Sequence, residues 1–195
     1  GGLGRVCDVL FCCVDHDAGR LATAVLATAY HRVLIDIGTG VGALGPDDDA
    51  PATPMGADVR MILPGDGCLL CRGALGDHDQ AIAALLSGRS LPLRDWRLQR
   101  RGSLRSLNQI AVGAAVHMLQ DLVAGRIERS TWLHLEYDIN GHLHVEYPQP
   151  EPRRRTDACG LCARAGMGDE VGGKPLPVAL ARTGRLGGEL WRLRR

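Results

Sequence analysis

Three consecutive segments near the N-terminus alternate between strand and helix patterns. Residues 9–14 are continuously apolar, which is typical of a strand covered on both faces. Apolar positions recur at helical spacing over residues 18 to about 30, and residues 33–37 form a second apolar run. A strand, a helix and a strand within about 30 residues predict one βαβ unit with parallel strands.

Two aspartates stand where the first predicted strand turns into the helix. Asp17 is a suitable N-cap for that helix, and Leu21, Val25 and Thr28 share one of its faces. Asp15 directly follows the strand. Because open α/β sheets bind ligands outside the carboxyl ends of their strands, we expect Asp15 to meet a ligand.

Further along the chain, the pattern predicts a third strand, two helices and a hairpin. The third strand covers residues 57–63, and a short helix covers 77–86. Ser106 and Gln109 form a capping box for a helix that runs to about residue 123. The expected core stripe of that helix consists of Leu107, Ile110, Ala114, Met118 and Leu122.

Alternating runs at 132–138 and 142–147 flank Asn140 and Gly141, and an Asn-Gly pair in this setting predicts a β-hairpin. One hairpin face is expected to be buried: Leu133, Leu135, Tyr137, Leu143, Val145 and Tyr147. The other face carries His134, Glu136, His142 and His144. This cluster is compatible with a metal, but a polar surface facing solvent is the preferred interpretation.

Composition narrows the possible classes of protein. The chain has 195 residues, enough for one domain with a proper core, and only 4% of them are aromatic. The formal net charge of +1 argues against a general nucleic-acid binder, and a zinc-ribbon nucleic-acid binder has only an arginine-rich stretch in its favour. No apolar run approaches membrane-spanning length and no secretory signal is present, so we expect a cytoplasmic protein without a membrane partner.

Four of the seven cysteines form two C-x-x-C pairs, and a tetrahedral structural zinc site is the simplest account of them. These cysteines are Cys68, Cys71, Cys159 and Cys162. Two disulfides or a redox pair are the alternatives. The separation of the pairs means that only the tertiary fold can close the site. The remaining Cys7, Cys12 and Cys13 are interpreted as small core residues.

The segment D-V-L-F-C-C-V-D-H-D-x-x-R, residues 8–20, resembles the strand-to-helix turn of the ThiF family of ubiquitin-activating-enzyme-like adenylyltransferases. The resemblance extends to about residue 162. It includes the glycine-rich segment 38–42 that follows the second strand, the third strand, both C-x-x-C pairs and the helix after residue 106. It implies an α/β fold with a Rossmann-like, ThiF-type sheet, flanking helices, a C-terminal β-hairpin and a Cys₄ zinc site. It also implies use of Mg-ATP, with Asp15 handling magnesium and phosphates, Arg20 assisting, and His16 in place of the usual Asn.

The same resemblance sets expectations for the rest of the chain. Gly1-Gly2-Leu3-Gly4 resembles the core of the family's glycine-rich turn, but a frayed or truncated end is expected because the nucleotide half of the fold looks missing. The arginine-rich region 89–105 corresponds to the crossover over the adenylate site and has no cysteine for a thioester. Residues 1–162 are assigned to the partial ThiF-like domain, and the Gly- and Arg-rich residues 163–195 to a C-terminal tail that is expected to be poorly ordered or to pack on a partner.

Two functions follow from these expectations. The first is ATP-dependent adenylation of the C-terminal glycine of a ubiquitin-like or sulfur-carrier protein by a homodimer. The second is a non-catalytic, zinc-stapled module, truncated or dependent on a partner, that dimerises or binds a ubiquitin-like protein. The apparent absence of the glycine-rich half favours the second for the isolated chain, and Mg-ATP binding distinguishes the two.

Overall fold

The structure, a computed structural model, describes residues 2–15, 17–41, 55–72, 74–75, 104–138, 140–148 and 159–173. The predicted helix at 77–86 and most of the arginine-rich region lie outside these residues. His16 also lies outside them.

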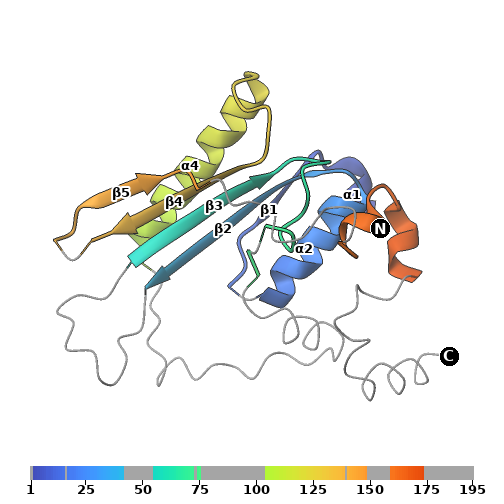
Figure 1. The fold of residues 1–195 in the computed structure, drawn as a ribbon, viewed down its shortest axis with the longest axis horizontal. Helices are drawn as coiled ribbons and strands as arrows, with labels where there is room; N and C mark the ends of the chain where they lie inside the picture. The colour runs from blue at the N-terminus through green and yellow to red at the C-terminus, as the bar shows by residue number, and fades with distance from the viewer. Residues whose placement is uncertain are drawn as a thin grey trace, which may run out of the picture.

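The described residues form an α/β fold around a five-stranded mixed sheet in the order β1-β2-β3-β4-β5 (Figure 1). The strands are β1 (Val9–Cys12), β2 (Val33–Val41), β3 (Met55–Ile62), β4 (Thr131–Tyr137) and β5 (Leu143–Glu146). Strands β1 and β2 are parallel, with Val9 opposite Val33, and helix α2 (Asp17–Ala29) connects them. The predicted βαβ unit is therefore confirmed. All other neighbouring strands pair antiparallel.

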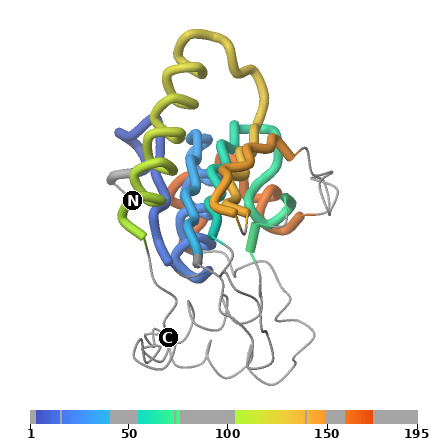
Figure 2. The backbone as a smooth tube through the Cα atoms, turned by 90° about the vertical axis from the view of Figure 1, so that its left-hand side faces the viewer, coloured from blue at the N-terminus to red at the C-terminus, as the bar shows by residue number. Residues whose placement is uncertain are grey.

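Two apolar clusters cover the two faces of the sheet, and the backbone view shows helix α4 along one side of the strands (Figure 2). On one side, here called the α4 face, helix α4 (Arg105–Val123) packs through Ala111 and Ala115 on Ile35 and Val59. On the opposite side, the α2 face, helix α2 and the segment that follows β3 enclose Leu34. Because side chains alternate along a strand, neighbouring residues of β2 contribute to different faces.

Two burial predictions for the strands are wrong because α4 covers β2 and β3 rather than the sheet edges. Phe11 of β1 is 44% exposed, so this strand is not covered on both faces. The hairpin of β4 and β5 is confirmed, and Leu133 and Leu135 are buried as predicted. Its outer apolar residues are exposed instead: Leu143, Val145 and Tyr147.

The start and the buried stripe of α4 also differ from the prediction. Leu104 is the N-cap and its apolar side chain accepts no capping hydrogen bond, so Ser106 lies inside the helix and the predicted capping box is absent. Leu107 and Met118 are buried as expected, but Ile110 is 38% exposed. The central part of the buried stripe runs one position further along, through the small residues Ala111 and Ala115, which let the helix approach the sheet closely.

Short helices lie at both ends of the described chain, where a frayed start and the beginning of a C-terminal tail were expected. Residues 2–6 form helix α1 (Gly2–Val6), and the Arg32 Nε donates to the Gly4 carbonyl at 3.0 Å. The predicted tail begins with two 3-10 helices, η2 (Cys162–Arg164) and η3 (Gly168–Gly173). Asp169 accepts hydrogen bonds from Arg5 and Tyr30, which ties η3 to α1 and α2. Within the described residues, no helix is both long and apolar enough to cross a membrane.

Candidate functional site

The fold brings the two C-x-x-C pairs together into one buried cluster. The Sγ atoms of Cys68 and Cys71 lie 3.8 Å apart, those of Cys68 and Cys159 3.7 Å, and those of Cys71 and Cys162 3.4 Å. Four sulfur atoms around one zinc ion at about 2.3 Å stand about 3.8 Å from each other in a tetrahedron. The donor set and its spacing therefore fit a zinc ion.

Two different local structures present the cysteine pairs. After β3 the chain turns through Gly65 and Gly67, whose φ angles of 95° and 99° lie in the left-handed region that favours glycine. Asp66 stabilises this turn, because its carboxylate accepts the Ser130 backbone N–H at 2.7 Å. The second pair begins just before η2, where the Ala163 N–H donates to the Cys159 carbonyl at 2.9 Å.

Burial and mutual hydrogen bonding make the four thiols unequal. A hydrogen bond from Cys162 lowers the pKa of Cys159, and the same bond raises the pKa of Cys162 to about 12. The hydrogen bond to Cys159 raises the pKa of Cys68, and burial raises the pKa of Cys71. One thiolate stabilised by its neighbours is the state expected of a thiol cluster without metal. A divalent cation supplies the charge that lets all four ionise.

The separations between the four sulfur atoms argue against disulfide bonds within the cluster. All four cysteines are free thiols, and their sulfur separations are far above the roughly 2.05 Å of a disulfide. Four thiolates leave no open coordination position, so a zinc ion here would be structural. Of the remaining cysteines, Cys12 is buried as predicted, but Cys13 is exposed.

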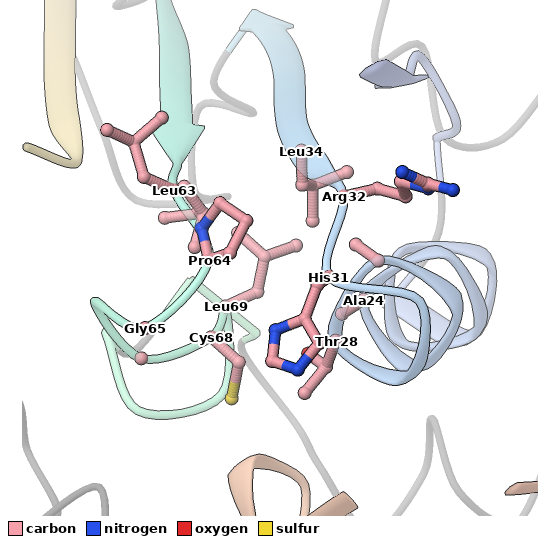
Figure 3. A pocket seen from close by; sticks show the side chains of 13 residues that line it. Ala24, Thr28, His31, Arg32, Leu34, Leu63, Pro64, Gly65, Cys68 and Leu69 are labelled. Carbon is pink, nitrogen blue, oxygen red and sulfur yellow. The ribbon is translucent and has the colours of Figure 1, made fainter. Parts of the chain in front are cut away.

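A small cavity separates α2 from the first cysteine pair (Figure 3). Ala24, Thr28 and His31 line one side, and Pro64 and Cys68 line the other. Its volume of about 30 Å³ is far below the several hundred cubic ångströms of typical ligand pockets. This cavity therefore does not accommodate a nucleotide.

The predicted catalytic pair lies at the carboxyl edge of the parallel strands. Asp15 is exposed in the bend that follows β1, and Arg20 lies in the first turn of α2. The Arg20 side chain is only 16% exposed and crosses the α2 face toward β2, where its Nε lies 3.6 Å from Asp36 Oδ1. Within the described residues, the Arg20 guanidinium has this ion pair with Asp36 and no hydrogen bond.

A buried carboxylate that sequence reasoning missed anchors this region. Asp36 of β2 is 0% exposed, and its Oδ2 accepts a hydrogen bond from Arg60 Nη1 at 3.1 Å. Arg60 also contacts Asp58 at 2.8 Å and stacks on the Trp132 ring at 4.5 Å. The signal was present in the sequence, because Asp36 interrupts an otherwise apolar strand.

The same network continues across the sheet to β4. The Asp58 Oδ1 accepts a hydrogen bond from Trp132 Nε1 at 2.7 Å and lies 2.9 Å from His134 Nδ1. His134 Nε2 lies 3.7 Å from Glu136. His134 and Glu136 lie on the face of β4 opposite the buried Leu133, as predicted. Among the described residues, the four-cysteine cluster is the one candidate metal site.

Comparison of the chain with protein-family models gives no match, and comparison with curated protein sequences gives none either.

Proposed function

We propose that this chain supplies the Asp15 and Arg20 half of an ATP-dependent adenylyltransferase of the ThiF type. Its substrate would be the C-terminal glycine of a ubiquitin-like or sulfur-carrier protein. The observation that carries the proposal is an exposed carboxylate directly after β1, followed in the first turn of α2 by an arginine that lies against the buried Asp36 of the neighbouring strand. Carboxyl ends of parallel strands are where α/β folds bind their ligands.

The proposed reaction needs these two side chains in different roles. The carrier's terminal carboxylate attacks the α-phosphate of ATP, the bond to the β-phosphate breaks, and pyrophosphate leaves with the electron pair. Asp15 would hold the magnesium ion that accompanies the triphosphate. Arg20 would donate hydrogen bonds to phosphate oxygens, where its planar fork fits two acceptors at once. No protein nucleophile is required.

The test is calorimetric titration of the zinc-loaded protein with Mg-ATP. We expect binding by the unmutated chain, at least tenfold weaker binding by Asp15→Asn, and no change in Asp8→Asn. Asp8 is the matched control because its side chain is 96% exposed and precedes the same strand. Absence of Mg-ATP binding by the unmutated protein would refute a self-sufficient enzyme. Where binding is found, pyrophosphate exchange with candidate carriers follows.

A non-catalytic role in protein binding is the second candidate, and the exposed side of β5 favours it. Leu143 and Val145 of β5, the edge strand of the described sheet, are 41% and 52% exposed, and Tyr147 just after the strand is 60% exposed. An apolar edge strand of this kind is a surface on which a second copy of the chain can pair. We expect a homodimer in sedimentation velocity that Val145→Lys converts to a monomer. A wild-type monomer would contradict this role for β5.

A further inference from the structure

The position of Arg20 depends on two residues of β2 that lie on the same face of the sheet. Asp36 is fully buried between two guanidinium groups from different elements, Arg60 of β3 and Arg20 of α2. Its Oδ2 accepts the hydrogen bond from Arg60, whereas its Oδ1 has no hydrogen-bond partner and lies 3.6 Å from the Arg20 Nε. The buried Asp36 carboxylate therefore attracts the Arg20 guanidinium through its Nε atom, and this contact does not involve the two Nη atoms.

Gly38 provides the space that the Arg20 side chain occupies. A Cβ built on Gly38 would overlap the Arg20 Nη2 and would stand 3.3 Å from both Cζ and Nη1. Gly38 does not belong to the residues with positive φ, so its backbone does not itself require glycine. The reason for a glycine at position 38 is therefore the Arg20 guanidinium, which occupies the space that a side chain would need.

Gly40 offers a direct comparison within the same strand. It lies two residues further along, on the same face as Gly38, and a Cβ built on it meets nothing within 4 Å. Adding a methyl group at Gly38 and adding one at Gly40 are thus the same chemical change on the same strand. Only the first touches Arg20.

Arg20 differs from Arg60 in how it is held. Arg60 is fixed by Asp36, Asp58 and the Trp132 ring, and its side chain is 8% exposed. Among the described residues, Arg20 has one ion pair, the 3.6 Å contact to Asp36, and its side chain is 16% exposed. Arg60 and Asp36 therefore form a well-anchored ion pair in the sheet. Arg20 is held by fewer contacts, which makes it the better candidate of the two arginines for binding a ligand.

We infer that Asp36 and Gly38 are positioning residues for Arg20, the first by charge and the second by leaving room. Together they hold the guanidinium across the middle of β2, where it binds an anionic group through its remaining N–H donors. The identity of that group as nucleotide phosphate rests on the proposed function. The placement of Arg20 by these two residues does not.

The test compares Gly38→Ala with Gly40→Ala in the zinc-loaded protein. The first readout needs no ligand: the Arg20 Nε–Hε signal in ¹H–¹⁵N NMR spectra, assigned by its loss in Arg20→Lys. We expect Gly38→Ala and Asp36→Asn to shift this signal and speed its exchange with water. Gly40→Ala should leave it at the wild-type position. An unchanged Arg20 signal in Gly38→Ala would overturn the inference. Gly40→Ala is a matched control because both variants add one methyl group to β2 and leave the charge of the protein unchanged.

The second readout is calorimetric titration with magnesium tripolyphosphate, an inorganic probe for the phosphate chain. Loss of well-placed hydrogen bonds to a charged group predicts roughly tenfold weaker binding in both Gly38→Ala and Arg20→Lys. The double variant should bind no more weakly than Arg20→Lys alone, because both changes act through the same side chain. Binding that is unchanged in Gly38→Ala would overturn the anion-binding role of the positioned Arg20. Absence of binding by the unmutated protein would refute the proposed function, while the NMR comparison still decides the positioning.

Discussion

The cysteine cluster predicts how strongly residues 159–173 are tied to the sheet. The perturbation is the double change of Cys159→Ser and Cys162→Ser, which removes half of the sulfur ligands and leaves the first pair intact. Without the second pair, the described contacts that remain are the packing of Leu161 in the α2-face cluster and contacts with α1 and α2, such as the Gly166 N–H to the Thr28 carbonyl at 3.3 Å. We therefore expect this segment to detach from the sheet before the rest of the chain unfolds.

The size of the effect follows from loop closure and burial. Cys71 and Cys159 enclose 87 residues (159 − 71 − 1), and cross-linking a loop of that length stabilises a fold by about 4.6 kcal/mol. Leu161 is 0% exposed between the cysteines, and its burial adds about 1.5–3 kcal/mol. The combined loss of about 6–8 kcal/mol is comparable to the whole stability of a typical domain, about 5–15 kcal/mol.

Hydrogen exchange measured by mass spectrometry at saturating zinc reports this loss locally. Peptides covering 159–173 should exchange at least a thousandfold faster in the double variant, whereas peptides from β2 and β3 should change less. Urea unfolding followed by far-UV circular dichroism reports the global change. Cys13→Ser is the matched control, because it makes the same replacement at an exposed cysteine outside the cluster.

Two results would refute this reasoning. Wild-type exchange rates at 159–173 in the double variant would show that the cluster does not tie the segment to the sheet. Equal stability of the wild-type protein with and without a zinc chelator would show that no metal contributes to the fold.

Three further predictions concern protons, buried charge and the hairpin turn. Burial and mutual hydrogen bonding raise the pKa values of Cys68, Cys71 and Cys162, so zinc binding should release protons and strengthen as pH rises. Calorimetry in buffers of different ionisation enthalpy measures this release, and zinc binding without it would contradict the prediction. Asp36→Ala removes the buried carboxylate shared by Arg60 and the partly buried Arg20 and leaves Arg60 only Asp58 among its described acidic partners. It should lower the unfolding free energy by about 3 kcal/mol in urea titrations, whereas a loss below about 1 kcal/mol would show that the pair is not desolvated. Gly141→Ala places a side chain at a φ of 81° and should cost about 1 kcal/mol by the same assay, with no loss expected if the turn adopts another conformation.

The sequence by itself determined the elements whose signals are local. An apolar run, an amphipathic segment and a second apolar run specify the βαβ unit, because the period of the pattern reflects the secondary structure directly. The Asn140-Gly141 pair specified the hairpin, since the turn needs a residue at positive φ. The C-x-x-C spacing likewise identified all four cysteines of the cluster.

Tertiary structure decided which faces are covered. Phe11 and Val145 look like core residues in sequence, but α4 lies over β2 and β3 and leaves both edges of the described sheet open. The same packing moved the buried stripe of α4 onto Ala111 and Ala115, because small side chains allow close approach. Burial depends on where a helix docks, and no local pattern encodes that position.

The surroundings of Arg20 likewise exist only in the folded chain. Asp36, Gly38 and Arg60 are separated from Arg20 by 16 to 40 residues in the sequence, and the register of β2 with β3 brings the three together. A charge inside an apolar strand indicates that a partner exists, but the identity of the partner depends on strand pairing. The sequence therefore named Arg20, and the fold shows what holds it in place.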